Sequence, residues 1–209
     1  MKTICAVGSG SELFNDYGPL PRSDLLRRYG YITPNYAQYD VVEIGSPLII
    51  DKASPSLEDA DRMVRVDYLL DQDVLDDSFD LDTSCSVPDE VIILVRTLLL
   101  SPDEFKRHRD AAKLPKPVLG EAVARVLAEV LDARLKDYPT TLEHDKSLLA
   151  EDGRVQGRER TAVAVRLGEK QILAGALQNL RRQIEGKRPT GLSREFSPQA
   201  GKKKRAKAS

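Results

Sequence analysis

The chain has 209 residues, of which 41% are hydrophobic and 31% are charged, a balance typical of a soluble globular protein with helical surfaces. No apolar run approaches the roughly 20 residues that a membrane-spanning helix requires. The two cysteines and two histidines lack the spacing of a zinc site. We therefore expect an intracellular protein of one domain, or one domain plus part of another, without a membrane span or a metal.

The formal net charge of −1 conceals an asymmetry along the chain. Residues 187–209 carry eight basic residues and one acid, which leaves residues 1–186 with a charge of −8. An acidic body favours a basic partner because opposite fields steer their encounter, although solubility alone could explain it. The end of the chain has few apolar residues and high charge, so it is predicted to be disordered.

The first predicted elements occupy the segment before residue 46. Residues 12–14 read as a short extended piece, followed by turn residues rich in Asn, Asp, Gly and Pro. A short helix is expected over 22–30, with Ser23 as its N-cap and Gly30 as its C-terminal stop. Residues 39–45 are compatible with a strand or with the first turns of a helix.

A helix is predicted to start near Ser56, with Leu57, Ala60, Val64 and Leu70 roughly in register on its apolar face. The stretch 67–90 then holds nine acids and no basic residue. It lacks the pattern of a calcium-binding loop, so a solvated acidic loop is favoured over a metal site. Within it, the alternation of residues 78–84 indicates a short strand.

Helices dominate from residue 87 onward. The helix in segment 87–100 has a nearly all-apolar face and should be the most buried helix, and Ser101 with Pro102 begins the next helix. Gly168 and Gly175 lie inside the last helix, where they either permit close packing or mark a bend. The predicted helices are 87–100, 101–113, 119–138, 140–150 and 157–186.

The aromatic residues are unevenly distributed. The chain has no tryptophan and four phenylalanines, yet four of its seven tyrosines (Tyr17, Tyr29, Tyr31 and Tyr36) fall in or just beyond residues 12–35. Such a cluster is either a local piece of core or the lining of a site.

Two motifs in this segment carry a resemblance to a known family. "ELFNDYG" (12–18) followed by "LLRRYGY" (25–31) resembles the end of the SET domain in the Rubisco and ribosomal-protein lysine methyltransferase family. In that family an all-helical substrate-binding domain follows, with an arginine-rich helix late in it that is similar to "RTAVAVRLGEKQIL" (160–173). The resemblance covers roughly residues 11–183, and the fungal ribosomal lysine methyltransferases are the most similar branch.

The resemblance implies a mainly α fold. We expect a multi-helix bundle of the Rubisco-methyltransferase substrate-binding type over residues 41–186. A small β-containing remnant of the SET domain would precede it at 1–40, and the disordered basic tail would follow at 187–209.

The resemblance also implies lysine N-methylation with S-adenosylmethionine as cofactor. Tyr17 matches the catalytic tyrosine of the family, and Tyr29 matches a tyrosine at the cofactor edge. Together with Tyr31 they would line the substrate lysine channel. Aromatic faces attract cations, and phenol oxygens can orient a neutral amine. Carboxylates would suit less well, because a full negative charge keeps an ammonium protonated.

The chain departs from the family pattern because no Asn-His cofactor motif occurs in it. We therefore expect a truncated catalytic domain that binds S-adenosylmethionine weakly or not at all. One alternative is a non-catalytic helical module that docks a basic partner such as a ribosomal protein or a histone. Another is a nuclear adapter that the basic tail directs to the nucleus, so both nuclear and cytoplasmic locations remain open.

The tail provides the first testable prediction. Lys202, Lys203, Lys204, Arg205 and Lys207 resemble a nuclear localisation signal, whereas direct nucleic-acid binding is disfavoured because the acidic body would repel phosphate. Deletion of residues 200–209 is expected to reduce nuclear accumulation of a fluorescent fusion in cells. Unaltered nuclear accumulation would remove the targeting role.

Overall fold

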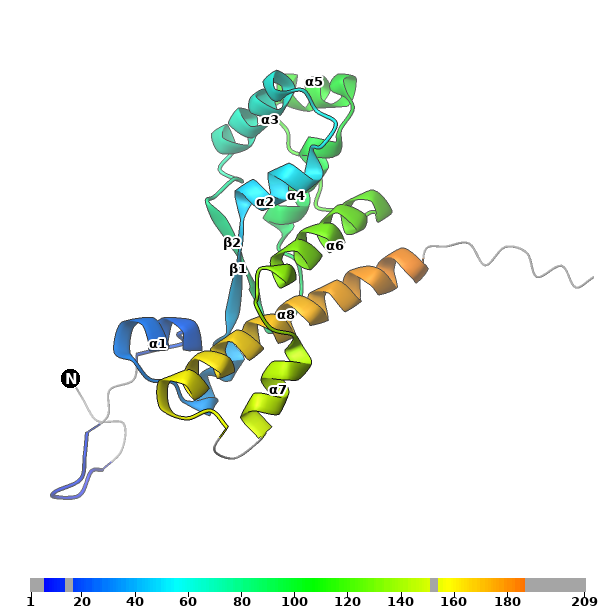
Figure 1. Ribbon diagram of the computed structural model, residues 1–209. Helices are drawn as coiled ribbons and strands as arrows, with labels where there is room; N and C mark the ends of the chain where they lie inside the picture. The colour runs from blue at the N-terminus through cyan, green and yellow to red at the C-terminus, as the bar shows by residue number, and fades with distance from the viewer. Residues whose placement is uncertain (1–5, 14–16, 151–153, 187–209) are drawn as a thin grey trace, which may run out of the picture.

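The computed structural model of the protein describes residues 6–13, 17–150 and 154–186 (Figure 1). The described chain is mostly helical, as expected, and it contains no helix long and apolar enough to cross a membrane. The expectations for Phe14 and for the basic tail lie outside the described residues. The elements are α1 (Arg22–Tyr29), the 3₁₀ helix η1 (Pro34–Tyr39), β1 (Val41–Gly45), α2 (Ser46–Ala53), α3 (Asp59–Asp71), β2 (Ser78–Asp82), α4 (Asp89–Leu99), α5 (Pro102–Asp110), α6 (Glu121–Lys136), α7 (Leu142–Ala150) and α8 (Gly157–Gly186).

Helix α1 ends where the sequence predicts but begins differently. Gly30 closes it in the left-handed conformation, with φ of 76°, which glycine adopts without steric cost. The N-cap prediction for Ser23 is wrong, since Ser23 lies inside the helix and the N-cap residue is Pro21. The extended piece predicted at 12–14 is also wrong in its described part, because Glu12 and Leu13 form no strand.

The two strands form one antiparallel pair, in which Val41 lies opposite Asp82 and Gly45 opposite Ser78. Residues 41–45 are thus a strand rather than a helix start, and the strand predicted within 78–84 is confirmed. Alternation explains both assignments, because one face of the pair is buried and the other is exposed. The buried side chains are Val42, Ile44, Phe79 and Leu81.

The segment between β1 and β2 holds three errors of prediction. Helix α2 was not predicted from its eight residues, and α3 starts at Asp59 rather than near Ser56. The predicted apolar face of α3 is also wrong, since Val64 is 42% and Leu70 is 51% exposed. The residues that α3 buries are Arg65, Tyr68 and Leu69.

Buried Arg65 explains why the orientation of α3 differs from the prediction. Its guanidinium donates to the carbonyl oxygens of Thr97 (2.7 Å) and Leu98 (3.4 Å) at the C-terminal end of α4, and it lies 4.7 Å from the ring centre of Phe105. These contacts compensate a charge that sequence patterns place at the surface. Burial lowers the pKa of Arg65 from its ordinary value.

The core lies between α2, α4, α6, α8 and the inner face of the strand pair. Helix α4 buries most of its length, as predicted: Val91, Ile92, Leu94, Val95, Thr97 and Leu98. Ser101 and Glu104 form the capping box that starts α5. The apolar stripe of α6 is buried at Val123, Leu127, Val130 and Leu131 and half-buried at Val126 and Leu135.

Helix α8 contacts more of the fold than any other described helix, since it packs on α6, α7, α1 and β1 (Figure 1). At its two internal glycines, side chains from other segments approach the helix backbone closely. A Cβ atom at Gly168 would collide with the side chains of Asp40 and Arg22, and one at Gly175 would lie 2.5 Å from Cys85 Sγ. The close-packing interpretation of both glycines is therefore confirmed.

Candidate functional site

The structure brings together the three tyrosines that the sequence singled out. The rings of Tyr17 and Tyr29 are stacked, with centroids 4.2 Å apart and an angle of 27° between their planes. The ring of Tyr31 follows at 6.4 Å from Tyr29. Each side chain is about 40% exposed (38%, 43% and 42%). We call these three residues the tyrosine wall, and they form a surface of ring faces and phenol groups rather than a piece of core.

The position of the tyrosine wall depends on how α1 is attached to the rest of the fold. Asp40, which is 5% exposed, accepts hydrogen bonds from the backbone N–H of Arg22 (3.1 Å) and from its guanidinium (2.9 and 3.0 Å to Nε). Asp40 thereby serves the first turn of α1, whose own N-cap residue makes no side-chain cap. Leu25 is fully buried one turn later, so α1 is fixed at both points.

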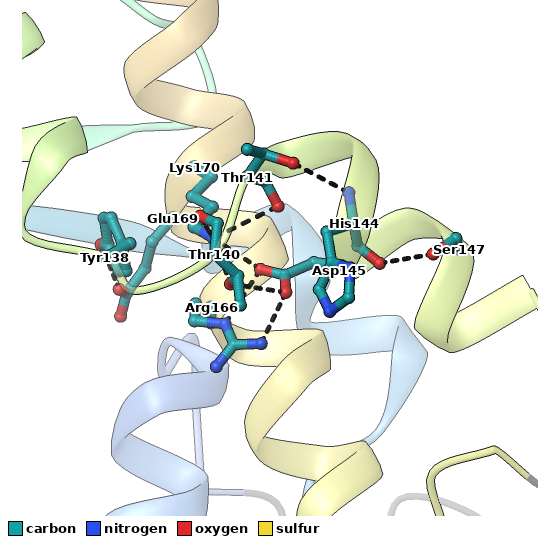
Figure 2. A network of polar contacts seen from close by, with 9 residues as sticks. All are labelled: Tyr138, Thr140, Thr141, His144, Asp145, Ser147, Arg166, Glu169 and Lys170. Carbon is teal, nitrogen blue, oxygen red and sulfur yellow. Dashed lines mark hydrogen bonds and ion pairs between the residues drawn. The ribbon is translucent and has the colours of Figure 1, made fainter.

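A second cluster of polar groups joins α7 to α8 (Figure 2). The carboxylate of Asp145 is completely buried and accepts hydrogen bonds from Lys170 (2.7 Å), Arg166 (2.9 Å) and Thr140 (2.8 Å). The ammonium of Lys170, itself 1% exposed, also donates to the carbonyl and hydroxyl oxygens of Thr140. We call Asp145, Lys170, Arg166 and Thr140 the α7–α8 network.

Charge pairing within this network outweighs burial. Burial alone would raise the pKa of Asp145, but hydrogen bonds from Arg166, Lys170 and Thr140 hold it well below its usual range. Beside the network, Tyr138 donates a hydrogen bond of 2.5 Å to Glu169. Burial is the main cause that raises the pKa of Tyr138, and the Glu169 carboxylate adds to it, so the phenol stays protonated. Every member of the α7–α8 network is thus paired, which identifies it as a structural joint.

Sequence reasoning missed this joint. Residues 140–150 are predicted only as a helix, with no buried polar cluster. The available signal was the spacing of Arg166 and Lys170, which lie four residues apart and so share a face of α8. Thr141 also marks the start of α7, since its hydroxyl accepts the backbone N–H of His144 (3.1 Å). Neither signal shows that Asp145 faces inward.

The described residues contain no group of three or more His, Cys, Asp or Glu arranged to hold a metal ion.

The sequence model of the family described as Rubisco LSMT substrate-binding matches residues 58–173, more than half of the chain. The chain belongs to this family of SET-domain lysine methyltransferases. The match extends from the turn before α3 to the middle of α8. It includes the whole α7–α8 network, whereas the tyrosine wall lies before it.

Individual relatives agree with this family. N-lysine methyltransferase SETD6 of Mus musculus is 24% identical over 193 residues, which cover 81% of this chain and 41% of SETD6. Ribosomal lysine N-methyltransferase 4 of Saccharomyces cerevisiae is 26% identical over 112 residues, covering 48% of this chain and 23% of the yeast protein. The chain thus spans about two fifths of the length of the first of these relatives and less of the second.

Solved structures show the same fold at low sequence identity. Rubisco LSMT bound to AdoMet aligns with a TM-score of 0.55 at 20% identity, covering 81% of this chain and 40% of LSMT. The SET domain of LSMT bound to lysine and AdoHcy aligns with a TM-score of 0.54, also at 20% identity and with the same coverage.

The α7–α8 network gives a stability prediction. Asp145→Asn should lower the free energy of unfolding by about 3–5 kcal/mol, because it leaves the ammonium of Lys170 buried without a full counter-charge. The matched control is Asp132→Asn, which loses contacts to Arg181 (3.5 Å) and Lys136 (3.6 Å) at the surface. It should cost about 1 kcal/mol or less. Denaturant unfolding measures both, and equal costs would contradict the buried joint.

The buried Asp145–Lys170 pair also predicts that stability depends on pH. Asp145 has a lower pKa in the folded state than its ordinary value of about 3.9 in the unfolded chain. Its contribution is therefore fully present above pH ~4 and is lost as the pH falls below that value toward the folded pKa. The stability gap between wild type and Asp145→Asn should narrow in acid, which unfolding curves at pH 7 and pH 3 can test. A gap independent of pH would contradict the assignment.

Proposed function

We propose that the protein contributes the helical substrate-binding region and one side of the lysine channel to an S-adenosylmethionine-dependent protein-lysine N-methyltransferase. The observation that carries the proposal is the tyrosine wall, which consists of the three residues that match the family's motif and lies next to a helical domain of that family. Its substrate would be a basic protein. A ribosomal protein is favoured by the name of the yeast relative, and a histone is the other candidate.

The wall has groups suited to a lysine side chain. Two stacked rings and a third ring beside them present aromatic faces that attract the cationic end of lysine. The hydroxyl of Tyr17 would orient the neutral amine by hydrogen bonding, so that the amine lone pair points at the methyl group it attacks. Tyr29 would lie at the edge of the cofactor, and Tyr31 would line the channel. S-adenosylmethionine, when bound, supplies an electrophilic methyl group.

The exposure of the wall indicates how it would have to function. Methyl transfer to an amine requires that water be kept from the reacting atoms, yet each of the three tyrosines is about 40% exposed. One aromatic wall does not by itself enclose a channel. We therefore propose that these 209 residues correspond to a truncated form of the enzyme, in which the remaining walls of the cofactor pocket are missing.

A non-catalytic role is the second candidate. The family match covers the helical region 58–173 and not the tyrosine wall, which favours a protein-binding module that docks a basic partner without modifying it. Binding of S-adenosylmethionine and methyl transfer distinguish the two functions, because only the enzyme requires them.

The first test concerns the cofactor. Isothermal titration calorimetry of the 209-residue chain with S-adenosylmethionine should show weak binding or none, since the exposed wall leaves a bound sulfonium in contact with water. S-adenosylhomocysteine provides the matched ligand without the positive charge. Micromolar binding of S-adenosylmethionine would show that the chain holds a complete pocket and would overturn the truncation proposal.

The second test concerns Tyr17. In the protein expressed from its complete gene, Tyr17→Phe should lower kcat for methyl transfer on the order of 10²-fold by removing the group that orients the amine. The folded structure should be unaffected, because only an exposed hydroxyl is lost. Tyr39→Phe is the control, since Tyr39 is equally exposed at 38% but makes an edge-to-face contact with Tyr36, outside the wall. Radiolabelled methyl incorporation is the measurement, and unchanged turnover in Tyr17→Phe would refute its role.

A further inference from the structure

Helix α3 carries apolar side chains on two sides, and only one side is covered. Its inner side packs on α4 and α5 through Tyr68, Leu69 and Arg65. On the opposite side, Met63 is 63%, Val64 is 42% and Leu70 is 51% exposed. Positions 60, 63, 64, 67, 70 and 71 share one side of an α-helix. Large apolar side chains gathered on one exposed face mark a site of interaction.

The exposed side of α3 is acidic as well as apolar. Asp67 and Asp71 lie on it, between and beside the apolar residues, and both are exposed. The stretch 67–90 that continues from this side contains nine acids and no basic residue. An acidic partner or a phosphate group would be repelled here, whereas a basic partner would be attracted.

A pocket adjoins the exposed face at Leu70. It has a volume of about 490 Å³, enough for a large apolar side chain. Its apolar lining comes from α2, α3 and the turn after α3, and Asp76 and Asp77 stand at its rim. The residues that line it are Ser46, Pro47, Ile50, Leu70, Leu75, Asp76 and Asp77.

The rim of this pocket is held in place. Buried Ser46, at the start of α2, donates its backbone N–H to the carbonyl oxygen of Asp77 (3.0 Å) and its hydroxyl to that of Asp76. Both carboxylates remain exposed. The pocket therefore combines a fixed backbone with exposed carboxylates, an arrangement that reduces the ordering cost of binding a partner.

We propose that the exposed face of α3 and the pocket beside Leu70 form a docking surface for a segment of the substrate protein in which lysines or arginines flank an apolar residue. The apolar side chain enters the pocket, and the flanking cations pair with Asp67, Asp71, Asp76 and Asp77. The inference rests on the proposed function in taking the partner to be the substrate protein. Docking itself requires neither the tyrosine wall nor the cofactor.

The test measures binding of a defined probe to the 209-residue chain. A fluorescein-labelled peptide with one central leucine between two runs of three lysine and arginine residues should bind with a measurable change in fluorescence anisotropy. The same peptide with serine in place of leucine should bind at least tenfold more weakly. A peptide with glutamates in place of the basic residues should not bind. Raising the salt concentration should weaken binding of the basic peptide, because the exposed pairs are screened.

Variants of the chain locate the surface. Asp76→Lys and Asp67→Lys should each weaken binding of the basic peptide by at least fivefold. Glu129→Lys makes the same charge change on the exposed side of α6 and should have little effect. Leu70→Ser should remove the preference for leucine over serine in the probe. Met63→Ser changes the most exposed apolar position on this face of α3, so it should leave the fold intact and weaken binding of the leucine peptide.

The outcomes separate this inference from the proposed function. If all variants bind the leucine peptide as the wild type does, the docking surface is wrong, whatever the methylation assay shows. If the variants lose binding and no methylation is found, the docking surface stands and the catalytic proposal fails. Sedimentation velocity tests whether a second copy of the chain binds to this face instead. A dimer that Leu70→Ser converts to a monomer would show that it does, and would overturn the inference.

Discussion

Three residues of α8, within the stretch 166–170, fix the parts of the molecule that matter for function. Arg166 and Lys170 hold Asp145 and with it α7, while Gly168 between them leaves the space that the Arg22–Asp40 pair fills. Opposite sides of this short stretch of α8 thus attach α7 and α1. Any side chain at position 168 would displace the pair that starts α1. The position of the tyrosine wall therefore depends on Gly168 in α8, which lies more than one hundred residues later in the chain.

This constraint explains which features the sequence could predict. The start of α5, the end of α1 and the stripe of α6 follow from local rules, since Ser101, Gly30 and Val130 act within one or two turns of their own helix. The face of α3 does not follow from them, because Arg65 is buried through contacts with α4 and α5 that no local pattern contains. The apolar residues that the sequence assigned to the core, Val64 and Leu70, are the ones left outside.

The tyrosine wall could be predicted from the sequence, whereas the α7–α8 network could not. Motif spacing in "ELFNDYG" and "LLRRYGY" was enough to select Tyr17, Tyr29 and Tyr31, and the structure places their rings together. Their mutual contact requires the reversal of the chain at Gly18 and Gly30, both of which have positive φ. The charged members of the α7–α8 network come from separate segments of the chain. Each of these residue types usually lies at the surface, so the sequence gives no sign that they pair. Only the fold reveals that Asp145 and Lys170 are buried against one another.

The strand pair determines how the proposed docking surface and the tyrosine wall could act on one substrate. Asp40, which fixes α1, immediately precedes β1, and Ser46, which fixes the pocket rim, immediately follows it. In Figure 1, α1 and α3 accordingly lie toward opposite ends of the pair. Five residues of strand span about 17 Å, and an extended peptide covers about 3.3 Å per residue. If the wall and the pocket are at least one strand length apart, a substrate engaged at both places needs about five residues or more between its docking segment and the modified lysine. A lysine next to the docking segment would be bound without reaching the wall, so selection among lysines would follow from their spacing as well as from their immediate neighbours.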